Sequence, residues 1–549
     1  MTTVYLETFG CQMNELDSEL VHGQLATLGY EFVSSANAAQ VLLYNTCSVR
    51  EQAEQKALSR IGIVGMRKKA GERLILGVIG CMAERDGLEL FRRHPQVDFL
   101  CGPGELDRVP QLVDSAMRSL MADPSAALPR PSQHDRAALA GNKSRRTATL
   151  AAAEDGLEAL DLSRAFDPIA SGRPAHTAFV RITRGCNKFC TYCVVPSTRG
   201  AEIHRPPQHI IDECRRLVDH GAKEVTLLGQ TVNHYRYQHG SAVTIAGLET
   251  AQVGPGLSAF RAAPTARTTT FADLLRRIHE EVPELPRLRF VTSYPRDFGD
   301  DILDCMRDSP RICRYLHAPA QSGSDRILKL MNRGYTVSEY IDFVDRAFAH
   351  LPDASLAGDF IVGFPTETDD DFEATCALVR RLPFKNNFIF KYSPRPGTAA
   401  ITRFADDVPD AVKRARNNAL LAVQGEATAR VHQRLIGTTH SVLFHEVRSR
   451  KGPRRDSNLF SPISVNGQSI DDQHAANPQS ADHWQAIGRT QGDIIVAVSS
   501  SNAQMFSDFV GSLRQVVISS ADSLLVHGDL VDAAATMTSR LPSEIGRRN

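Results

Sequence analysis

Four short apolar segments in the first 101 residues each lead directly into a cysteine. They are residues 4–10 before Cys11, 41–46 before Cys47, 74–80 before Cys81 and 97–100 before Cys101. Helical patterns separate these segments at 15–28, 49–69 and 83–93. Short apolar strands that alternate with helices are typical of α/β units built on a parallel sheet. The sequence therefore predicts a parallel α/β domain over residues 1–120.

The position of these cysteines predicts a shared ligand site. In open parallel sheets, ligands bind outside the carboxyl ends of the strands, so residues far apart in sequence meet at one edge. Cys11, Cys47 and Cys81, with Cys101 as a candidate fourth, are placed to bind an iron–sulfur cluster through their thiolates. A single free cysteine is commonly just a small buried side chain. Three or four of them at equivalent strand ends favour the cluster.

A second set of cysteines, Cys186, Cys190 and Cys193, follows the apolar run 178–182 at spacings of four and three. Three thiolates can hold three irons of a four-iron cluster and leave the fourth iron open. An open coordination position is where catalytic metal sites carry out chemistry. The alternatives are unrelated buried cysteines or a zinc site. His204 lies 11 positions after Cys193, beyond the usual spacing of zinc ligands.

The strand–helix alternation resumes near His176 and predicts a partial barrel of six units over residues 172–432. The expected strands are 178–182, 225–228, 288–292, 315–318, 355–362 and 388–392. The expected helices include 207–220, 271–282, 337–351 and 369–381. Loops at the carboxyl ends of barrel strands carry the site. Gln230, Ser293, Gln321 and Asp359 fall there and offer hydrogen-bond donors and acceptors, although turns and helix caps use the same residue types.

The remaining segments of the chain have less distinctive sequence patterns. Residues 121–171 are expected to be a linker with one short helix, and 433–531 a small antiparallel barrel. The barrel strands are expected at 441–446, 494–498, 509–519 and 523–526. Insertions are expected at 238–269 and 448–482, and a tail of no predicted structure at 532–549. Barrels of this size commonly bind RNA.

Composition limits the partners and the compartment. The formal net charge is zero, so overall charge does not indicate a nucleic-acid partner. The longest apolar stretch, 74–83, is about half of a membrane span. The first residues lack a basic start, so we expect no signal peptide and no membrane association. Eleven cysteines in such a chain favour metal binding over disulfides and predict a reducing, cytoplasmic location.

The Cys-x3-Cys-x2-Cys spacing, with the aromatic Tyr192 before the last cysteine, resembles that of the radical S-adenosylmethionine (SAM) enzymes. The resemblance implies that SAM binds the open iron and is cleaved to methionine and a 5′-deoxyadenosyl radical. Segments 229–233, 292–295, 321–324 and 359–365 resemble the SAM-facing segments, which implies cofactor contacts for Gln230, Ser293, Gln321 and Asp359. Tyr192 would contact the adenine through its backbone. Tyr294 stands where the family usually has a histidine.

The segments around Cys11, Cys47 and Cys81 resemble the amino-terminal domain of the methylthiotransferases, most closely the tRNA-modifying MiaB type. The deciding residues are 12–14 and 82–85, because the branch that modifies a ribosomal protein typically has proline after the first cysteine. The match implies a second four-iron cluster at these three cysteines, hence about eight irons per chain. Cys101 falls outside the motif and is expected to be structural. Residues 487–490, with the strands around them, resemble a TRAM domain, a tRNA-binding module.

The resemblance implies a function. A tRNA methylthiotransferase of this type adds a methylthio group to C2 of N6-isopentenyladenosine 37, with SAM as methyl and radical source. The implied partners are the tRNA anticodon stem-loop and a reductase or flavodoxin-type electron donor, and we expect a monomer. The alternatives are the same chemistry on threonylcarbamoyladenosine 37 or on a ribosomal-protein aspartate. A non-enzymatic iron–sulfur protein that binds RNA or transfers electrons is more remote.

Overall fold

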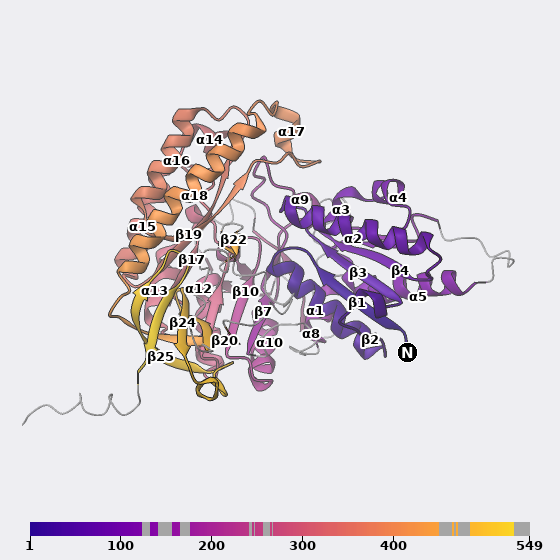
Figure 1. The fold of residues 1–549 in the computed structure, drawn as a ribbon, viewed down its shortest axis with the longest axis horizontal. Helices are drawn as coiled ribbons and strands as arrows, with labels where there is room; N and C mark the ends of the chain where they lie inside the picture. The colour runs from indigo at the N-terminus through magenta and orange to yellow at the C-terminus, as the bar shows by residue number, and fades with distance from the viewer. Residues whose placement is uncertain are drawn as a thin grey trace, which may run out of the picture.

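The computed structural model describes residues 1–122, 132–140, 156–164, 176–240, 244–245, 248–255, 264–265, 267–449, 464–465, 468–469 and 484–531. The described chain forms an amino-terminal α/β domain, a central barrel and a small carboxy-terminal barrel (Figure 1). Both outer parts pack against the central barrel. Within the described part of the chain, no helix combines the length and the apolar character needed to cross a membrane.

The amino-terminal domain contains one six-stranded sheet in which every pair is parallel, as predicted. Its order is β2-β1-β3-β4-β5-β6. The strands are β1 (Thr3–Thr8), β2 (Glu31–Phe32), β3 (Val41–Thr46), β4 (Ile75–Gly80), β5 (Phe99–Cys101) and β6 (Ala137–Ala138). The helices are α1 (Gln12–Thr27), α2 (Glu51–Lys69), α3 (Cys81–Asp86), α4 (Glu89–Arg93) and α5 (Val109–Met121).

Both faces of this sheet are buried, which explains its continuous apolar strands. Successive residues of a strand point to opposite faces. Ile75 and Ile79 accordingly join the core that includes Leu16 of α1, whereas Leu76 and Val78 join the core that includes Ile61 of α2. The sheet is therefore held between two helical layers, and its carboxyl edge is left for the strand-end cysteines.

Two local features of this part differ from the prediction. The expected helix at 83–93 is divided into α3 and α4, because Gly87 between them has a φ of +53°, which glycine tolerates best. The segment 121–171 contains β6, which pairs with β5, in addition to the expected short helix, α8 (Gly156–Leu162). A two-residue strand is too short to show alternation in the sequence. Residues 123–131, 141–155 and 165–175 lie outside the described residues.

The central barrel has the six expected strands in two parallel halves. They are β7 (Thr177–Arg181), β10 (Glu224–Leu228), β16 (Arg287–Phe290), β17 (Tyr315–His317), β18 (Ser355–Val362) and β19 (Phe384–Lys391). The pairing orders are β7-β10-β16 and β17-β18-β19, and a parallel bridge between Leu288 and Ile312 joins the halves. The last strand begins at Phe384, earlier than the predicted residue 388. The partial barrel is confirmed.

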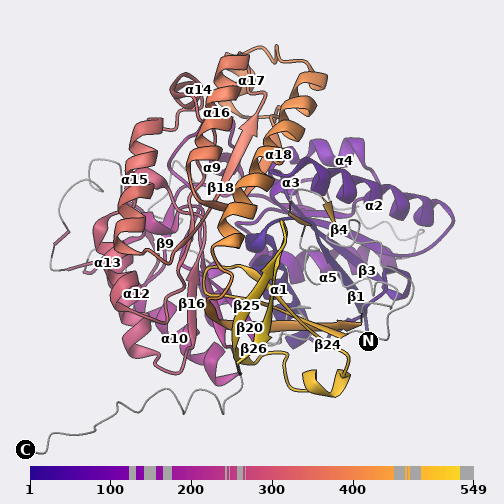
Figure 2. The same ribbon diagram turned by 60° about the vertical axis from the view of Figure 1, so that its left-hand side comes forward.

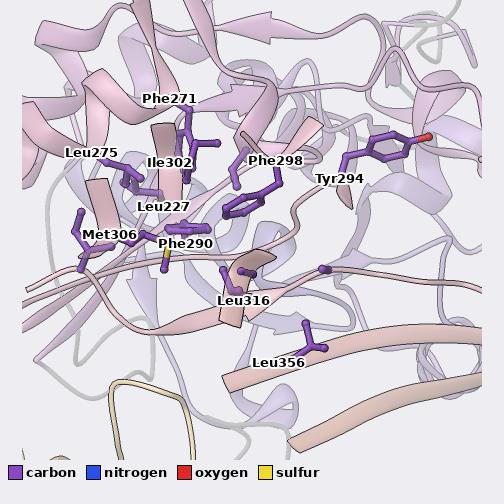
Figure 3. Close-up of a cluster of buried hydrophobic side chains, with 14 of the residues drawn as sticks. Leu227, Phe271, Leu275, Phe290, Tyr294, Phe298, Ile302, Met306, Leu316 and Leu356 are labelled. Carbon is purple, nitrogen blue, oxygen red and sulfur yellow. The ribbon is translucent and has the colours of Figure 1, made fainter. Parts of the chain in front are cut away.

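Helices cover the outside of the barrel and its apolar core. They are α10 (Pro207–Asp219), α12 (Phe271–Glu281), α13 (Asp300–Asp308), α14 (Asp325–Leu330), α15 (Val337–His350), α16 (Asp369–Arg381) and α18 (Asp410–Gln433). Figure 3 shows Phe290 between Phe271 and Phe298, with Ile302 of α13 alongside. The Phe271 and Phe290 rings meet edge to face, with centroids 5.1 Å apart. Such aromatic pairs add to the stabilisation that burial gives.

The carboxy-terminal barrel is closed and five-stranded, in the order β20-β23-β24-β26-β25. Its strands are β20 (Thr439–Ser449), β23 (Trp484–Arg489), β24 (Ile495–Ser500), β25 (Leu513–Ala521) and β26 (Val526–Leu530). All pairs are antiparallel except β24 with β26. Figure 2 shows this barrel below α18. The small barrel is confirmed, but the sequence prediction missed β23, and the tail at 532–549 lies outside the described residues.

The expected insertions are partly described. In the first, β11 (Arg236–Gln238) pairs with β15 (Thr268–Thr270), and β14 (Gln252–Val253) pairs with β9 (Ile203–His204). In the second, β21 (Ser464–Val465) pairs with β22 (Gln468–Ser469), and most other residues of that segment lie outside the described chain. The first insertion is therefore attached to the barrel through the strand that follows the second cysteine set.

Two histidines join the central barrel to the carboxy-terminal barrel. His176 Nε2 lies 2.9 Å from His445 Nδ1, and the rings are stacked with centroids 5.2 Å apart. Burial lowers the pKa of His176 to about 4 and that of His445 to about 3. Glu224 faces both rings and opposes the shift, whereas Arg287 and Arg489 reinforce it at His445. Both imidazoles are therefore neutral at pH 7.

This pair predicts an acid-labile interface. Unfolded histidine titrates near pH 6.5, so the unfolded state binds more protons between pH 6.5 and 4, and stability falls as the pH falls through that window. The pKa shift of buried His176 corresponds to a loss of about 3 kcal/mol in the free energy of unfolding once the pH has fallen through the whole window. We expect the melting temperature, measured by calorimetry, to drop between pH 7 and 5.5, and to drop less in His445→Gln. Equal drops in both proteins would contradict the assignment.

Candidate iron–sulfur and cofactor sites

The barrel cysteines lie in a loop that begins after β8 (Thr183–Arg184) and ends at α9 (Val195–Thr198). Gly185 has a φ of +69°, and a Cβ there would lie 2.0 Å from the carbonyl oxygen of Ala201, so only glycine fits the turn. Burial raises the pKa of Cys186 to about 11, and the neighbouring Cys190 adds to the shift. Burial, Cys190 and Cys186 likewise raise the pKa of Cys193. The three thiols therefore lie on one short loop, where they influence one another electrostatically.

A buried arginine that the sequence analysis did not identify contacts this loop. Arg333 Nη1 donates to Cys190 Sγ at 3.3 Å and to Tyr192 Oη at 3.4 Å, and Nη2 donates to the Pro319 carbonyl oxygen at 3.0 Å. Its guanidinium carbon lies 4.8 Å from the centroid of the Tyr294 ring. Tyr294, at the position where a histidine is usual, thus forms part of the arginine's aromatic surroundings. Only the tertiary fold brings Arg333 to the cysteines.

The four candidate cofactor residues belong to four successive strands of the barrel: three follow the end of a strand and one lies within a strand. Gln230 follows β10 and is half-buried, and Ser293 follows β16 and is buried. Ser293 Oγ has no hydrogen-bond partner among the described residues, although it is buried. Gln321 follows β17 with a φ of +73°, and its N–H donates to the Asp359 carbonyl oxygen at 2.7 Å. Asp359 lies inside β18 rather than in the following loop, and its Oδ1 is 3.4 Å from His317 Nε2.

His204 belongs to a buried polar group that contains no cysteine. Its Nε2 is 2.8 Å from Glu202 Oε1, and His234 Nδ1 is 2.6 Å from the same oxygen. Burial of Glu202 opposes ionisation, but the hydrogen bonds from both imidazoles lower the pKa of Glu202 to about 2. Glu202 also raises the pKa of Cys186. This group fixes β9 against the residues that follow β10, just behind the cysteine loop.

The amino-terminal cysteines lie at the carboxyl ends of three adjacent strands, β1, β3 and β4. Cys11 is the N-cap residue of α1, Cys47 directly follows β3, and Cys81 is the first residue of α3. Burial, followed by the neighbouring Cys47, raises the pKa of Cys11. Burial raises the pKa of Cys81 to about 12, with contributions from Cys47 and Cys11. The predicted convergence at the edge of the sheet is therefore present.

Asn14 explains part of the motif that follows Cys11. Its Oδ1 accepts from Cys11 Sγ at 3.3 Å, and its Nδ2 donates to Asn45 Oδ1 at 2.9 Å and to the Thr46 carbonyl oxygen at 3.1 Å. Asn14 is fully buried. It therefore ties the first cysteine to the end of β3, next to Cys47.

Cys101 does not share this arrangement. It is fully buried within β5, and its Sγ donates to the Glu105 carbonyl oxygen at 3.0 Å. Burial, Glu105 and Asp107 raise its pKa well above the ordinary value. These contacts fit a cysteine that fills the core of the domain.

Comparison with known proteins places the chain among enzymes that use this kind of site. Residues 180–379 match the Radical SAM superfamily, and residues 3–102 match an uncharacterized protein family, UPF0004. The chain is a radical SAM enzyme, a class that implies a [4Fe–4S] cluster and SAM. Among solved structures, it is similar to the radical S-adenosylmethionine methyltransferase TsrM from Kitasatospora setae, with 13% identity, a TM-score of 0.48, and coverage of 83% of this chain and 79% of that one.

Curated relatives define the family more narrowly. The chain is 42% identical over 471 residues to the tRNA-2-methylthio-N(6)-dimethylallyladenosine synthase of Rhodopirellula baltica, covering 86% of this chain and 88% of that protein. It is 38% identical over 460 residues to the protein of the same name from Neisseria gonorrhoeae, covering 82% and 90%. The chain belongs to the tRNA-2-methylthio-N(6)-dimethylallyladenosine synthase family. The threonylcarbamoyladenosine, ribosomal-protein and non-enzymatic alternatives are not favoured.

Proposed function

We propose that this protein adds a methylthio group to C2 of N6-isopentenyladenosine 37 in tRNA. The observation that carries the proposal is the pair of three-cysteine sites in one chain. One site lies at the carboxyl edge of the amino-terminal sheet, and the other lies on the barrel loop that leads into α9. Relatives that share most of the chain bear the name of this synthase activity, which supports the substrate assignment.

The residues present fit two four-iron clusters, with Cys186, Cys190 and Cys193 holding one and Cys11, Cys47 and Cys81 holding the other. Each set leaves one iron without a cysteine from its own motif. Two buried hydroxyls belong to these regions: Ser293 Oγ follows barrel strand β16, and Ser48 Oγ belongs to the residue after Cys47. Neither of these two oxygens has a partner within the part of the chain that the structure describes. A bound polar ligand would supply the hydrogen-bond partner that each of these buried hydroxyls lacks.

When bound, the clusters and SAM supply a radical that removes the unreactive C2 hydrogen and a sulfur and methyl group that replace it. The chain's own residues hold and shield these groups. Arg333 places a positive charge against Cys190, which offsets the negative charge of thiolate ligands. Gln230, Ser293, Gln321 and Asp359 offer amide, hydroxyl and carboxylate groups for the amino acid and ribose of SAM. Tyr192 lies in the loop that carries Cys190 and Cys193, and it would contact the adenine of SAM through its backbone.

The carboxy-terminal barrel is the proposed TRAM-like module for the tRNA anticodon stem-loop. Small barrels bind RNA through backbone charge and stacking. A reductase or flavodoxin-type protein would deliver the electrons, and the enzyme would act as a cytoplasmic monomer. These assignments extend the proposed reaction to its partners.

Analysis of tRNA nucleosides tests the proposal. In a strain lacking the gene, we expect 2-methylthio-N6-isopentenyladenosine to disappear and N6-isopentenyladenosine to accumulate, because the preceding modification is intact. Mass spectrometry of digested tRNA measures both, and the intact gene on a plasmid should restore the methylthio form. Unchanged 2-methylthio-N6-isopentenyladenosine would refute the proposal. Loss of the methylthio form of threonylcarbamoyladenosine would instead redirect it to that nucleoside.

A further inference from the structure

Arg199 is a barrel residue whose side chain reaches α1, the helix that Cys11 caps. It directly follows α9, six positions after Cys193. Its Nη2 donates to Asp17 Oδ2 at 2.8 Å, and Asp17 lies on α1, the helix that Cys11 caps. Helix α9 also packs against α3, which begins at Cys81 (Figure 1). The guanidinium is therefore held between α1 and the barrel, beside the helix pair α9 and α3.

The guanidinium is a buried positive charge close to the cysteine site. Asp17, which accepts from it, lies six residues after Cys11 on α1, and α3, which packs against α9, begins at Cys81. In keeping with this position, Arg199 opposes the rise that burial causes in the pKa values of Cys11 and Cys81. Arg50 is the second cation that acts on Cys11. The Arg199 side chain is only 6% exposed, so water screens its field weakly.

A buried ion-pair network fixes the position of Arg199. Asp17 also accepts from Arg181 Nη1 at 3.3 Å, and Arg181 Nη2 donates to both carboxylate oxygens of Asp161 at 2.8 and 2.9 Å. Asp161 lies on α8, Asp17 on α1 and Arg181 at the end of β7. Three separate segments thus hold the carboxylate that orients Arg199. These ion pairs fix the position of the Arg199 guanidinium, so its positive charge stays at this buried interface and does not move into solvent.

We infer that Arg199 is a positioning residue by which the barrel sets the electron affinity of the cluster at Cys11, Cys47 and Cys81. The inference rests on the proposed function, because it assumes the second cluster. A fixed positive charge favours the reduced, more negative form of a cluster, and net charge nearby is one of the factors that set such potentials. The radical-generating part of the chain would therefore tune the sulfur-carrying part through one side chain.

The test uses the full chain with alanine at Cys186, Cys190 and Cys193, so that only the amino-terminal cluster can form. After anaerobic reconstitution with iron and sulfide, we measure the iron content and the midpoint potential by an EPR-monitored redox titration. Arg199→Met should lower the equilibrium constant for reduction of the amino-terminal cluster about tenfold. For a one-electron couple, this is a fall of about 59 mV in the midpoint potential. Arg199→Lys, which keeps the charge, should restore most of the loss.

Arg164→Met is the matched control. Arg164 is similarly buried at the same interface, but its partners are Glu19 and, at 3.1 Å, Glu213 rather than Asp17. It should leave the midpoint potential unchanged. Should Arg199→Met lose its iron, Asp17→Asn provides the second measurement, because removing the paired negative charge should raise the potential.

The outcomes separate the inference from the proposed function. If the parent protein without barrel cysteines binds no iron, the proposed second cluster is wrong. If it binds about four irons and Arg199→Met has the parental potential, the inference about Arg199 is wrong. An equal fall in Arg164→Met, or an unchanged potential in Asp17→Asn, would also overturn it, because the effect would then be structural rather than due to the charge of Arg199.

Discussion

Replacing Cys81 by alanine should abolish methylthio transfer while the barrel continues to cleave SAM. Cys81 is the first residue of α3 and one of the three cysteines that meet at the sheet edge. Its loss removes one of the three thiolates proposed for the amino-terminal cluster, so iron should fall from about eight to about four per chain. Iron analysis, release of 5′-deoxyadenosine and mass spectrometry of the tRNA product measure the three effects separately.

Cys101→Ala is the matched control for this experiment. Cys101 is buried in the same domain, on the strand next to β4, and its thiol donates to a backbone carbonyl. We expect a modest loss of stability with iron content and product formation retained. Full product formation by Cys81→Ala would contradict the assignment of the amino-terminal cysteines, and loss of four irons in Cys101→Ala would move Cys101 into the cluster.

Replacing Cys186 by alanine should abolish both SAM cleavage and product formation. The barrel cluster is the proposed source of the radical, so nothing downstream of it can proceed without its ligands. The amino-terminal cluster should remain, and iron should again fall to about four per chain. Mössbauer or EPR spectra should show one cluster type that no longer responds to added SAM.

Cys214→Ala separates this effect from general damage to the barrel. Cys214 is fully buried on α10 in the barrel core and does not belong to the cysteine loop. Its replacement should cost about 1 kcal/mol of stability, the usual effect of a small core change, and leave SAM cleavage intact. Persistent 5′-deoxyadenosine formation by Cys186→Ala would remove this cysteine from the proposed radical site.

The elements that carry the cysteines could be predicted because their signals are local. An apolar run that ends at Cys47 or Cys81 and precedes a helix identifies a parallel strand and places its end. The loop of Cys186, Cys190 and Cys193 is likewise readable from spacing alone. The sequence also indicated the small carboxy-terminal barrel, although β23 was missed beside an insertion that obscured its start.

The side chains that adjust the sites could not be predicted in the same way. Arg333 lies 143 positions from Cys190 in sequence, and Arg199 reaches Asp17 across 182 positions. Nothing in the local sequence of either arginine indicates a contact with a distant segment, because arginines are common on surfaces. For Asp359, by contrast, a local sequence signal was present but misleading. Its polarity suggested a loop, but the residue lies within β18, where it faces His317.

The acidic residues of α8 limit where the polypeptide can be cut. Glu158 accepts from Arg205 Nε at 2.8 Å and Asp161 accepts from Arg181, although α8 precedes the barrel in sequence. Both arginines are completely buried. Removing the partner of a buried ion typically costs 3–5 kcal/mol. A barrel fragment that begins after α8 would therefore leave Arg181 without a carboxylate partner and Arg205 with Glu213 alone, so the barrel depends for its stability on segments that precede it in sequence.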